Sequence, residues 1–384
     1  MEEPNLFYVD AIAHGGDGIV REGGRAIFVP AVLPGEKVSI KIVPGRGKVM
    51  RAELIEVAAP SPHRVEPACP YYSRCGGCRL QHAEYSYQIE LKREIIKDAF
   101  NRIGGMDIQP GPAVPSPIEY GYRSRTRFHV KKGRPGFFGE RKSEFVPVDK
   151  CLISSEAINY AIDPLKKLVK KSKASQIEVI DDPDRGVLAV LITGREHKIM
   201  KLSGDRWEKA ADERVFFTQV NPGQNRNLRE IVRKLADEAG PENVIELYAG
   251  AGNLTGVLLE KSRKVTAVES DPEAVEEASD VLGNSENLRL VTADAGAFLD
   301  SEAEKFKADL VVLDPPRTGA REAVPGILRL GPSHIIYVSC DPATLARDAA
   351  MLVDGGYSVE SVVPLDMFPQ TAQVEAVTLF RKNR

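Results

Sequence analysis

The sequence predicts a multidomain α/β protein with a small N-terminal β-barrel, a central α/β domain and a C-terminal doubly wound α/β domain. Its 384 residues are too many for one ordinary hydrophobic core. Short apolar runs interrupted by glycine and proline fill the N-terminal part, whereas strand-like and helix-like segments alternate after Asn243. A cluster of cysteines lies between these two parts. We therefore expect three domains, at residues 1–60, 61–215 and 216–384.

The composition is that of a globular protein without a membrane-spanning segment. Hydrophobic residues make up 42% of the chain, and no apolar run approaches the ~18 residues that a span requires. The N-terminal segment MEEPNLFYVD is acidic and lacks the basic and apolar regions of a secretory signal. We expect a cytoplasmic monomer that binds no membrane. Because the net charge is -3, any nucleic-acid-binding surface has to be local.

Residues 1–60 contain three stretches typical of short strands, FYVDAIAHGGDGIV, GRAIFVPAVLPGEKVSIKIV and KVMRAELIEVAAP. Because glycine and proline interrupt them at short intervals, they predict a small all-β barrel or sandwich. The segment from Lys37 to Arg51 carries five Lys or Arg and no acidic residue. The first domain is therefore expected to have a local positive surface.

The central domain begins with a proline-rich connector, PSPHRVEPACP. Helical periodicity predicts one helix within HAEYSYQIELKREIIKDAFNRIGG and a second from Ser154 to Lys171, while SQIEVIDD and GVLAVLITG are typical of strands. Between Gly121 and Lys142, eight Lys or Arg stand against Glu140 alone and alternate with Tyr and Phe. That mixture neutralises phosphates and stacks bases, although a solvated strand face would produce the same alternation.

The C-terminal domain shows five strand-like segments, NVIELYAG, KVTAVES, LRLVTAD, ADLVVLDPP and HIIYVSC, each followed by a helix-like stretch. Such alternation predicts βαβ units and a parallel sheet covered on both faces. The last two strands, YSVESVVPLDMF and VEAVTLFRK, have no helix between them. They predict an antiparallel edge.

A glycine turn, IELYAGAGNLTG, places Gly250 and Gly252 where the first of these strands meets a helix. Glycines there let a ligand approach the backbone closely. Glu269 ends the second strand, where a carboxylate can accept hydrogen bonds from ribose hydroxyls, and Asp294 ends the third. Because the carboxyl ends of parallel strands share one edge of the sheet, these groups predict a cofactor crevice.

The turn favours S-adenosylmethionine over a nicotinamide cofactor. A dinucleotide site usually has the spacing G-x-G-x-x-G, but the third glycine here comes late, at Gly256. The acid in the preceding strand, Glu246, suits a cationic ligand better than a phosphate. S-adenosylmethionine has an ammonium group, a ribose and an adenine but no phosphate.

Four of the five cysteines have the spacing of metal ligands. Cys69, Cys75 and Cys78 form a C-x5-C-x2-C cluster, and Cys151 follows much later. Three clustered cysteines with one distant cysteine favour an iron-sulfur cluster, because structural zinc sites usually use two close pairs. Zinc remains the alternative, since spacing does not fix the metal.

Cys340 is left outside this set. It ends the fifth parallel strand, at the sheet edge where ligands bind, and is followed by Asp341. A free cysteine often packs as a small hydrophobe, but a thiol at this position can face a substrate. We interpret it as a candidate nucleophile. A free thiol has a pKa of about 8.5, so its surroundings must activate it; Arg317 is a possible source of positive potential, which Asp341 opposes.

With these parts in place, the chain resembles the RNA uracil-5 methyltransferases that carry an N-terminal TRAM domain. The resemblance covers essentially the whole length, through the TRAM-like (OB-like) barrel and the motifs CPYYSRCGGC, FTQVNPGQN, ELYAGAGNLT, DPPRTG, SCDPATL and FPQTAQVEAVTLF. It implies a Rossmann-like methyltransferase domain, S-adenosylmethionine as methyl donor, a structural 4Fe-4S cluster held by the four cysteines, and RNA as partner.

The resemblance also implies roles for individual residues. Cys340 would be the nucleophile and Glu375 the base. The S-adenosylmethionine pocket would be lined by Gln219, Tyr248, Asn253, Glu269, Asp294 and Asp314. One departure is Gln373, which stands where relatives commonly have histidine and which cannot titrate.

The resemblance leaves the RNA open. We expect a uridine in 23S rRNA slightly more than one in tRNA, because barrel and cluster together are most similar to the rRNA enzymes. Two alternatives are an RNA cytosine-5 methyltransferase and a redox-sensing RNA-binding protein without activity. The first would usually carry its nucleophile in a Pro-Cys motif after the fourth strand, where this chain reads DPPRTG.

Overall fold

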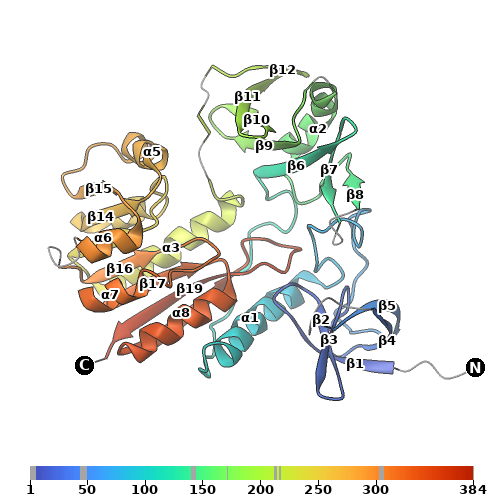
Figure 1. The fold of residues 1–384 in the computed structure, drawn as a ribbon, viewed down its shortest axis with the longest axis horizontal. Helices are drawn as coiled ribbons and strands as arrows, with labels where there is room; N and C mark the ends of the chain where they lie inside the picture. Colours follow the sequence, from blue (N-terminus) through green and yellow to red (C-terminus); the bar gives the residue numbers. More distant parts are fainter. Residues whose placement is uncertain are drawn as a thin grey trace, which may run out of the picture.

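The computed structural model describes residues 6–43, 50–139, 144–170, 172–211, 214–215, 218–301 and 307–383. Its strands form one closed barrel and two seven-stranded sheets, which follow one another along the chain (Figure 1). None of the helices within these ranges has both the length and the apolar character needed to cross a membrane.

The N-terminal strands close into a barrel, which decides between the two predicted all-β folds. The strand order is β1-β2-β3-β5-β4, and the barrel interior is filled by small β-branched and aliphatic side chains such as Val9, Val20 and Ile27. The strands are β1 (Leu6–Ile12), β2 (Gly18–Glu22), β3 (Arg25–Val29), β4 (Lys37–Val43) and β5 (Met50–Ala59). Part of the predicted basic segment, residues 44–49, lies outside the described residues.

The central sheet is antiparallel throughout, with the order β12-β11-β10-β9-β6-β7-β8. The strands are β6 (Arg125–Lys131), β7 (Arg134–Phe138), β8 (Phe145–Pro147), β9 (Gln176–Asp182), β10 (Gly186–Thr193), β11 (Glu196–Ser203) and β12 (Arg206–Lys209). The predicted second helix is α2 (Glu156–Val169), capped by Ser155, and it covers one face of the sheet. Lys171 and residues 140–142 of the basic stretch lie outside the described residues.

Helix α1 (Tyr85–Arg102) precedes the central sheet in sequence but packs elsewhere. Its apolar side chains, including Leu91, Ile95 and Phe100, join the core of the C-terminal domain. In Figure 1 it lies beside α8 (Pro342–Asp354). This helix therefore connects the cysteine segment to the C-terminal sheet.

The C-terminal sheet has the order β15-β14-β13-β16-β17-β19-β18, in which the first five strands are parallel and β19 is antiparallel to both of its neighbours. This confirms the predicted parallel sheet and antiparallel edge. The strands are β13 (Asn243–Leu247), β14 (Lys264–Glu269), β15 (Leu288–Thr292), β16 (Leu310–Leu313), β17 (His334–Ser339), β18 (Tyr357–Leu365) and β19 (Glu375–Lys382).

Helices cover both faces of this sheet, as a doubly wound domain requires. One face packs against α1, α6, α7 and α8, and the other against α3 and α4. The remaining elements are α3 (Pro222–Ala239), α4 (Thr255–Leu258), the 3-10 turn η1 (Glu260–Ser262), α5 (Pro272–Leu282), α6 (Ala295–Ser301) and α7 (Val324–Leu330). The carboxyl ends of the parallel strands are therefore free to carry a site.

Candidate active site

The predicted nucleophile and the predicted base lie side by side because β17 and β19 run antiparallel. Their register pairs Ser339 with Ala376. Cys340 follows Ser339 and Glu375 precedes Ala376, so both lie at the end of this ladder, where the Glu375 charge adds to burial in raising the pKa of the Cys340 thiol. Both line the same cavity as Asp314.

This cavity has a volume of about 1330 Å³, which exceeds the ~300–1,000 Å³ typical of small-ligand sites. It is lined by all three parts of the chain. The barrel and the cysteine segment contribute His14, Asp17, Arg51, Gly76, Gly77 and Arg79, the central region contributes Arg123, His129 and Phe138, and the C-terminal domain contributes Gln219, Asp314, Arg317, Cys340, Glu375 and Gln373. The cavity is therefore large enough for a ligand bigger than a typical small molecule.

The pKa values of three acidic groups in the cavity are raised. Burial, followed by the nearby Glu375 and Asp314 carboxyls, raises the pKa of the Cys340 thiol to about 11, although Arg317 acts in the opposite direction. Burial and the Asp314 charge raise the pKa of Glu375 to about 8, again against Arg317. Burial raises the pKa of Asp314 to about 7. Arg317 thus provides the predicted positive potential, but it does not outweigh burial and the two carboxyls.

Asp341, which was expected to oppose a thiolate, caps helix α8. Its Oδ1 atom accepts hydrogen bonds from the backbone N–H groups of Ala343 and Thr344, both at 3.0 Å. The positive end of the helix dipole stabilises a carboxylate at this position. The negative charge is therefore directed towards the helix terminus.

Helix α8 also holds the DPPRTG segment that carries Arg317. The buried Asp348 carboxylate accepts hydrogen bonds from the Ala320 backbone N–H at 2.7 Å and from the Tyr337 hydroxyl at 2.8 Å. Arg347 donates to the Thr318 carbonyl at 3.0 Å. Sequence reasoning missed these two residues, although a buried position for Asp348 could have been suspected from its place among alanines and leucines.

The glycine turn has the expected backbone geometry. Gly250 and Gly252 have φ angles of 54° and 85°, in the left-handed region that glycine adopts readily. The Gly250 backbone N–H donates to Glu269 Oε2 at 2.9 Å, and Glu269 Oε1 accepts from the Asp271 N–H at 2.9 Å. These bonds fix the Glu269 carboxylate at the mouth of the predicted crevice.

Other residues predicted to bind S-adenosylmethionine lie at the same carboxyl edge of the parallel strands. Asn253 forms a reciprocal amide pair with Asn225 of α3, with distances of 2.9 and 3.0 Å; Asn225 was not found from the sequence. Asp294 Oδ1 accepts from the Ala297 N–H at 3.1 Å at the start of α6. Burial and the Asp294 charge raise the pKa of Tyr248 to about 12, so this hydroxyl stays neutral. Gln219 lies apart from this group, in the cavity with Cys340.

These residues fit S-adenosylmethionine. Glu246 is buried in β13, its Oε2 atom has no hydrogen-bond partner among the described residues, and burial raises its pKa to about 8. A buried acceptor without a partner is costly unless a ligand or water satisfies it. A ligand with a positive charge and ribose hydroxyls would satisfy the acceptors at this edge. The turn, Glu246 and Glu269 thus offer the close backbone approach and the carboxylate acceptors on which the prediction from the sequence was based.

Comparisons with known proteins place the chain among RNA-modifying enzymes. The profile of the family described as tRNA (Uracil-5-)-methyltransferase matches residues 197–383. The chain is 30% identical to the 23S rRNA (uracil(1939)-C(5))-methyltransferase RlmD of Shewanella frigidimarina, over 98% of this chain and 95% of that protein. It is also 30% identical to the enzyme of the same name from Alcanivorax borkumensis, over 100% and 98% of the two chains.

The chain belongs to the RNA uracil-5 methyltransferase family. It is therefore an S-adenosylmethionine-dependent RNA (uracil-C5) methyltransferase, which rules out the cytosine-5 and inactive alternatives. The crystal structure of Pyrococcus abyssi tRNA (uracil-54, C5)-methyltransferase in complex with S-adenosyl-L-homocysteine has the same fold, with a TM-score of 0.70, 24% identity and coverage of 98% of this chain and 100% of that one.

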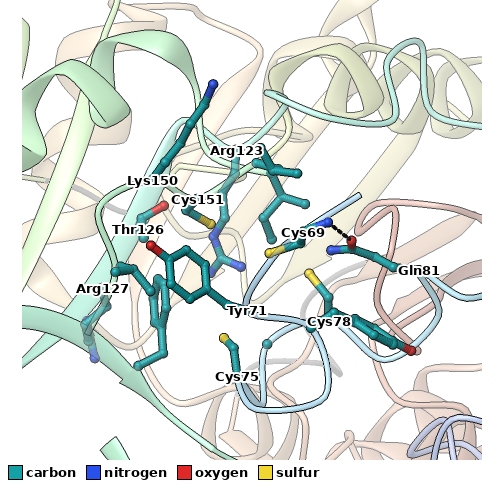
Figure 2. Close-up of a pocket in the computed structure, with 16 residues that line it drawn as sticks. Cys69, Tyr71, Cys75, Cys78, Gln81, Arg123, Thr126, Arg127, Lys150 and Cys151 are labelled. Carbon is teal, nitrogen blue, oxygen red and sulfur yellow. Dashed lines mark hydrogen bonds between the residues drawn. The ribbon is translucent and has the colours of Figure 1, made fainter. Parts of the chain in front are cut away.

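In this methyltransferase the four remaining cysteines surround a second cavity. Figure 2 shows the sulfur atoms of Cys69, Cys75, Cys78 and Cys151 turned towards the same space, which measures about 190 Å³. All four are free thiols. Burial raises the pKa of Cys75 to about 11 and that of Cys78 to about 12, so four thiolates would need compensating positive charge.

The cysteine cavity is lined by twelve further residues besides the four cysteines. In the ranges that the structure describes, no three His, Cys, Asp or Glu side chains are close enough to hold a single metal ion. The backbone around the thiols is nevertheless fixed, because Asn159 accepts from the Cys151 N–H at 2.7 Å and donates to its carbonyl at 3.0 Å. Gln81 accepts from the Cys69 N–H at 3.1 Å. Neither amide was found from the sequence, because nothing in its spacing marks it.

Proposed function

We propose that this enzyme methylates uracil C5 through a covalent bond between Cys340 and C6, with Glu375 as the base that completes the reaction. The observation that carries this proposal is the pairing of a thiol with a buried carboxylate in one cavity. Glu375 is only 5% exposed, and its Oε2 atom has no hydrogen-bond partner among the described residues. A buried, unpartnered carboxylate next to a thiol is arranged for proton transfer rather than for stability.

The chemistry requires both groups. Uracil C5 is a poor nucleophile, but addition of the Cys340 thiolate to C6 breaks the C5–C6 π bond and produces an enolate whose C5 attacks the donor's methyl group. The C5–CH3 bond forms as the methyl–sulfonium bond breaks. C5 then carries both a methyl group and a hydrogen. Glu375 takes that proton, the C5–C6 double bond re-forms, and the Cys340 thiolate leaves.

Three further side chains have roles in this proposal. Burial raises the pKa of both Cys340 and Glu375, and Arg317 partly opposes that rise, which favours the thiolate and the carboxylate that the reaction needs. Asp314 lines the same cavity and would hydrogen-bond the uracil edge. Gln373 also lines the cavity, where an amide can hydrogen-bond the substrate but cannot exchange a proton at neutral pH.

S-adenosylmethionine would be held at the adjoining edge and supply an electrophilic methyl group. The proposed residues are those named from the sequence, Gln219, Tyr248, Asn253, Glu269, Asp294 and Asp314. The hydrogen bonds that fix Glu269, Asn253 and Asp294 support this assignment. Asp314 and Gln219 line the cavity of Cys340 and would connect the S-adenosylmethionine pocket to that cavity.

We propose 23S rRNA as the substrate. Relatives named as 23S rRNA (uracil-C5)-methyltransferases match the whole chain at 30% identity, and the cavity wall includes residues of the barrel and of the central domain. His129 and Phe138 pack their rings at 4.6 Å on that wall, beside Arg123. Aromatic rings and guanidinium groups are suited to stack and neutralise an unpaired RNA strand.

The substrate test uses labelled S-adenosylmethionine with separated rRNA and tRNA from a strain that lacks the enzyme. We expect label in 5-methyluridine of the large-subunit rRNA, at one mapped position. Label confined to tRNA would overturn the rRNA proposal but keep the reaction. Absence of 5-methyluridine from every fraction would contradict the proposed reaction itself.

We propose that Cys69, Cys75, Cys78 and Cys151 hold a structural 4Fe-4S cluster. Two observations support this proposal: three clustered cysteines with one distant cysteine favour an iron-sulfur cluster over structural zinc, and the four sulfur atoms are turned towards one cavity. The cluster would supply the positive charge that four buried thiolates require. None of the proposed reaction steps needs an electron.

Replacing Cys151 by serine is expected to remove most of the iron and acid-labile sulfide, which should be about four of each per chain in the native protein purified without oxygen. The thermal midpoint of unfolding should fall, because the metal stabilises only the folded chain. Cys340→Ser is the matched control and should retain the full iron content. Stoichiometric zinc without sulfide in the native protein would contradict the cluster proposal.

A further inference from the structure

The segment between β18 and β19, residues 366–374, ends at Glu375 and is held by distant parts of the chain. Four successive carbonyls in it each accept a hydrogen bond from a different segment. The donors are Asn221 Nδ2 to Met367 O at 3.2 Å, Lys92 Nζ to Phe368 O at 2.9 Å, the Tyr122 hydroxyl to Pro369 O at 3.0 Å, and the Arg79 and Leu80 backbone N–H groups to Gln370 O, both at 3.0 Å. We call residues 366–374 the base segment.

These bonds are protected from water. The side chains of Asn221, Lys92 and Tyr122 are at most 3% exposed. The last pair of donors comes directly after Cys78, so the cysteine segment is bonded to the backbone of the base segment. The position of the base segment is therefore determined by α1, by the N-terminus of α3, by Tyr122 and by the cysteine segment together.

Gln370 has the least favourable backbone in this segment. Its φ angle is 70°, in the left-handed region that residues other than glycine rarely adopt. Such a conformation persists only where the surroundings over-determine it. Besides the Arg79 and Leu80 N–H groups, Gln370 is held by Gln88 of α1, which accepts from the Gln370 backbone N–H at 3.0 Å and donates to Gln370 Oε1 at 3.0 Å. Gln88 also donates to the Ala83 carbonyl at 2.9 Å.

The residues between Gln370 and Glu375 are also held in place by packing. Ala372 follows Gln370 and lies against the barrel loop, where a Cβ atom on Gly16 would come within 2.9 Å of the Ala372 Cβ. Thr371, Ala372 and Gln373 all line the catalytic cavity. Glu375 pairs with Leu365 at the start of β19 and its Oε2 atom has no hydrogen-bond partner among the described residues, so the base segment and this ladder together set where the carboxylate points.

We propose that Gln88 is a positioning residue for the proton-removal step, which it serves by fixing Gln370 and thereby the segment that presents Glu375. The proposal rests on the roles proposed above for Cys340 and Glu375. Gln88 does not line the cavity, and its hydrogen bonds to the base segment are the two that it makes with Gln370. Its loss should therefore leave thiol addition and methyl transfer intact while it slows the release of methylated RNA.

Substitution of Gln88 tests the role of the base segment better than substitution of the neighbouring ion pair does. Lys92 and Asp366 form a salt bridge whose side chains are both 1% exposed. Removing either one would leave an uncompensated buried charge, which destabilises the whole fold. Gln88 is neutral, so Gln88→Leu removes its two hydrogen bonds to Gln370 and the one to the Ala83 carbonyl without leaving a buried charge.

The test follows a single turnover of the Gln88→Leu variant with large-subunit rRNA and labelled S-adenosylmethionine. The rate of forming the denaturation-resistant RNA–protein adduct and the rate of its release are measured separately. We expect adduct formation close to the native rate and release slowed by roughly 10²-fold, because a displacement of about 1 Å at a reacting group has that effect. The adduct, carrying the labelled methyl group, should accumulate.

Three further variants serve as controls for this test. Leu91→Ala on the same helix removes a buried side chain of the core and should lower the thermal midpoint without accumulating adduct. Gln370→Gly suits the φ angle of 70° and keeps the backbone bonds, so it should fold and should slow release, to a smaller extent. Glu375→Gln is the reference for a missing base.

Release at the native rate in both Gln88→Leu and Gln370→Gly would overturn the proposal. An equal fall in the rates of adduct formation and adduct release would also overturn it, because that result is expected of a residue with a structural role only. If Gln88→Leu does not fold, Gln370→Gly alone decides. Failure of Glu375→Gln to accumulate adduct would instead contradict the proposed role of Glu375, so the two failures are distinguishable.

Discussion

Cys340→Ala is expected to abolish methyl transfer, with a loss in kcat/KM of ~10⁴-fold or more, because covalent nucleophiles act as a unit with their bases. Without the thiol, no bond forms at C6 and C5 never becomes a carbanion. The residue is partly buried at the end of β17, so its replacement by alanine removes one sulfur atom without opening a large cavity in the core. The folded state should therefore persist.

The measurement is transfer of labelled methyl groups to RNA, together with a gel assay for the covalent adduct. Cys340→Ser provides the closest control of shape, and it should also lack the adduct because a serine hydroxyl is far less nucleophilic than a thiol. Both variants should bind RNA and S-adenosylmethionine with native affinity. Methyl transfer by Cys340→Ala at more than a few per cent of the native rate would disprove the nucleophile assignment.

The fold could be predicted from the sequence wherever local patterns determine the arrangement. Alternation of strands and helices after Asn243 determines a parallel sheet, and the absence of a helix between the last two strands determines the antiparallel edge. The packing of α1 could not be predicted in this way. Its periodicity shows that one face is apolar, but not that this face covers the C-terminal sheet.

The site could be predicted in composition but not in its contacts. Cys340 and Glu375 were identified separately, yet their adjacency follows from the register of β17 with β19, which no local pattern records. Lys92 pairs with Asp366, 274 residues away, and Gln88 bonds Gln370, 282 residues away. The left-handed φ of Gln370 is equally invisible, because glutamine does not signal that conformation as glycine does.

Glu375→Gln is expected to block the enzyme after methyl transfer. Glutamine has nearly the shape of glutamate but cannot accept the C5 proton, and loss of a positioned base slows a step by ~10²–10⁴-fold. Labelled RNA should therefore remain covalently bound through Cys340, while the first turnover of methyl transfer continues. Free methylated RNA formed at the native rate would show that another group removes the proton.

The same carboxylate should determine how release depends on pH in the native enzyme. Burial, and then the Asp314 charge, raises the pKa of Glu375 to about 8, and only the ionised carboxylate can act as the base. Release should therefore be slow below pH 8 and should accelerate as the pH rises through this value, whereas a carboxyl with an ordinary pKa would give a constant rate above about pH 6. Single-turnover release measured in matched buffers checks this. In Glu375→Gln the residual release should lose that pH dependence, because no titrating base remains at this position.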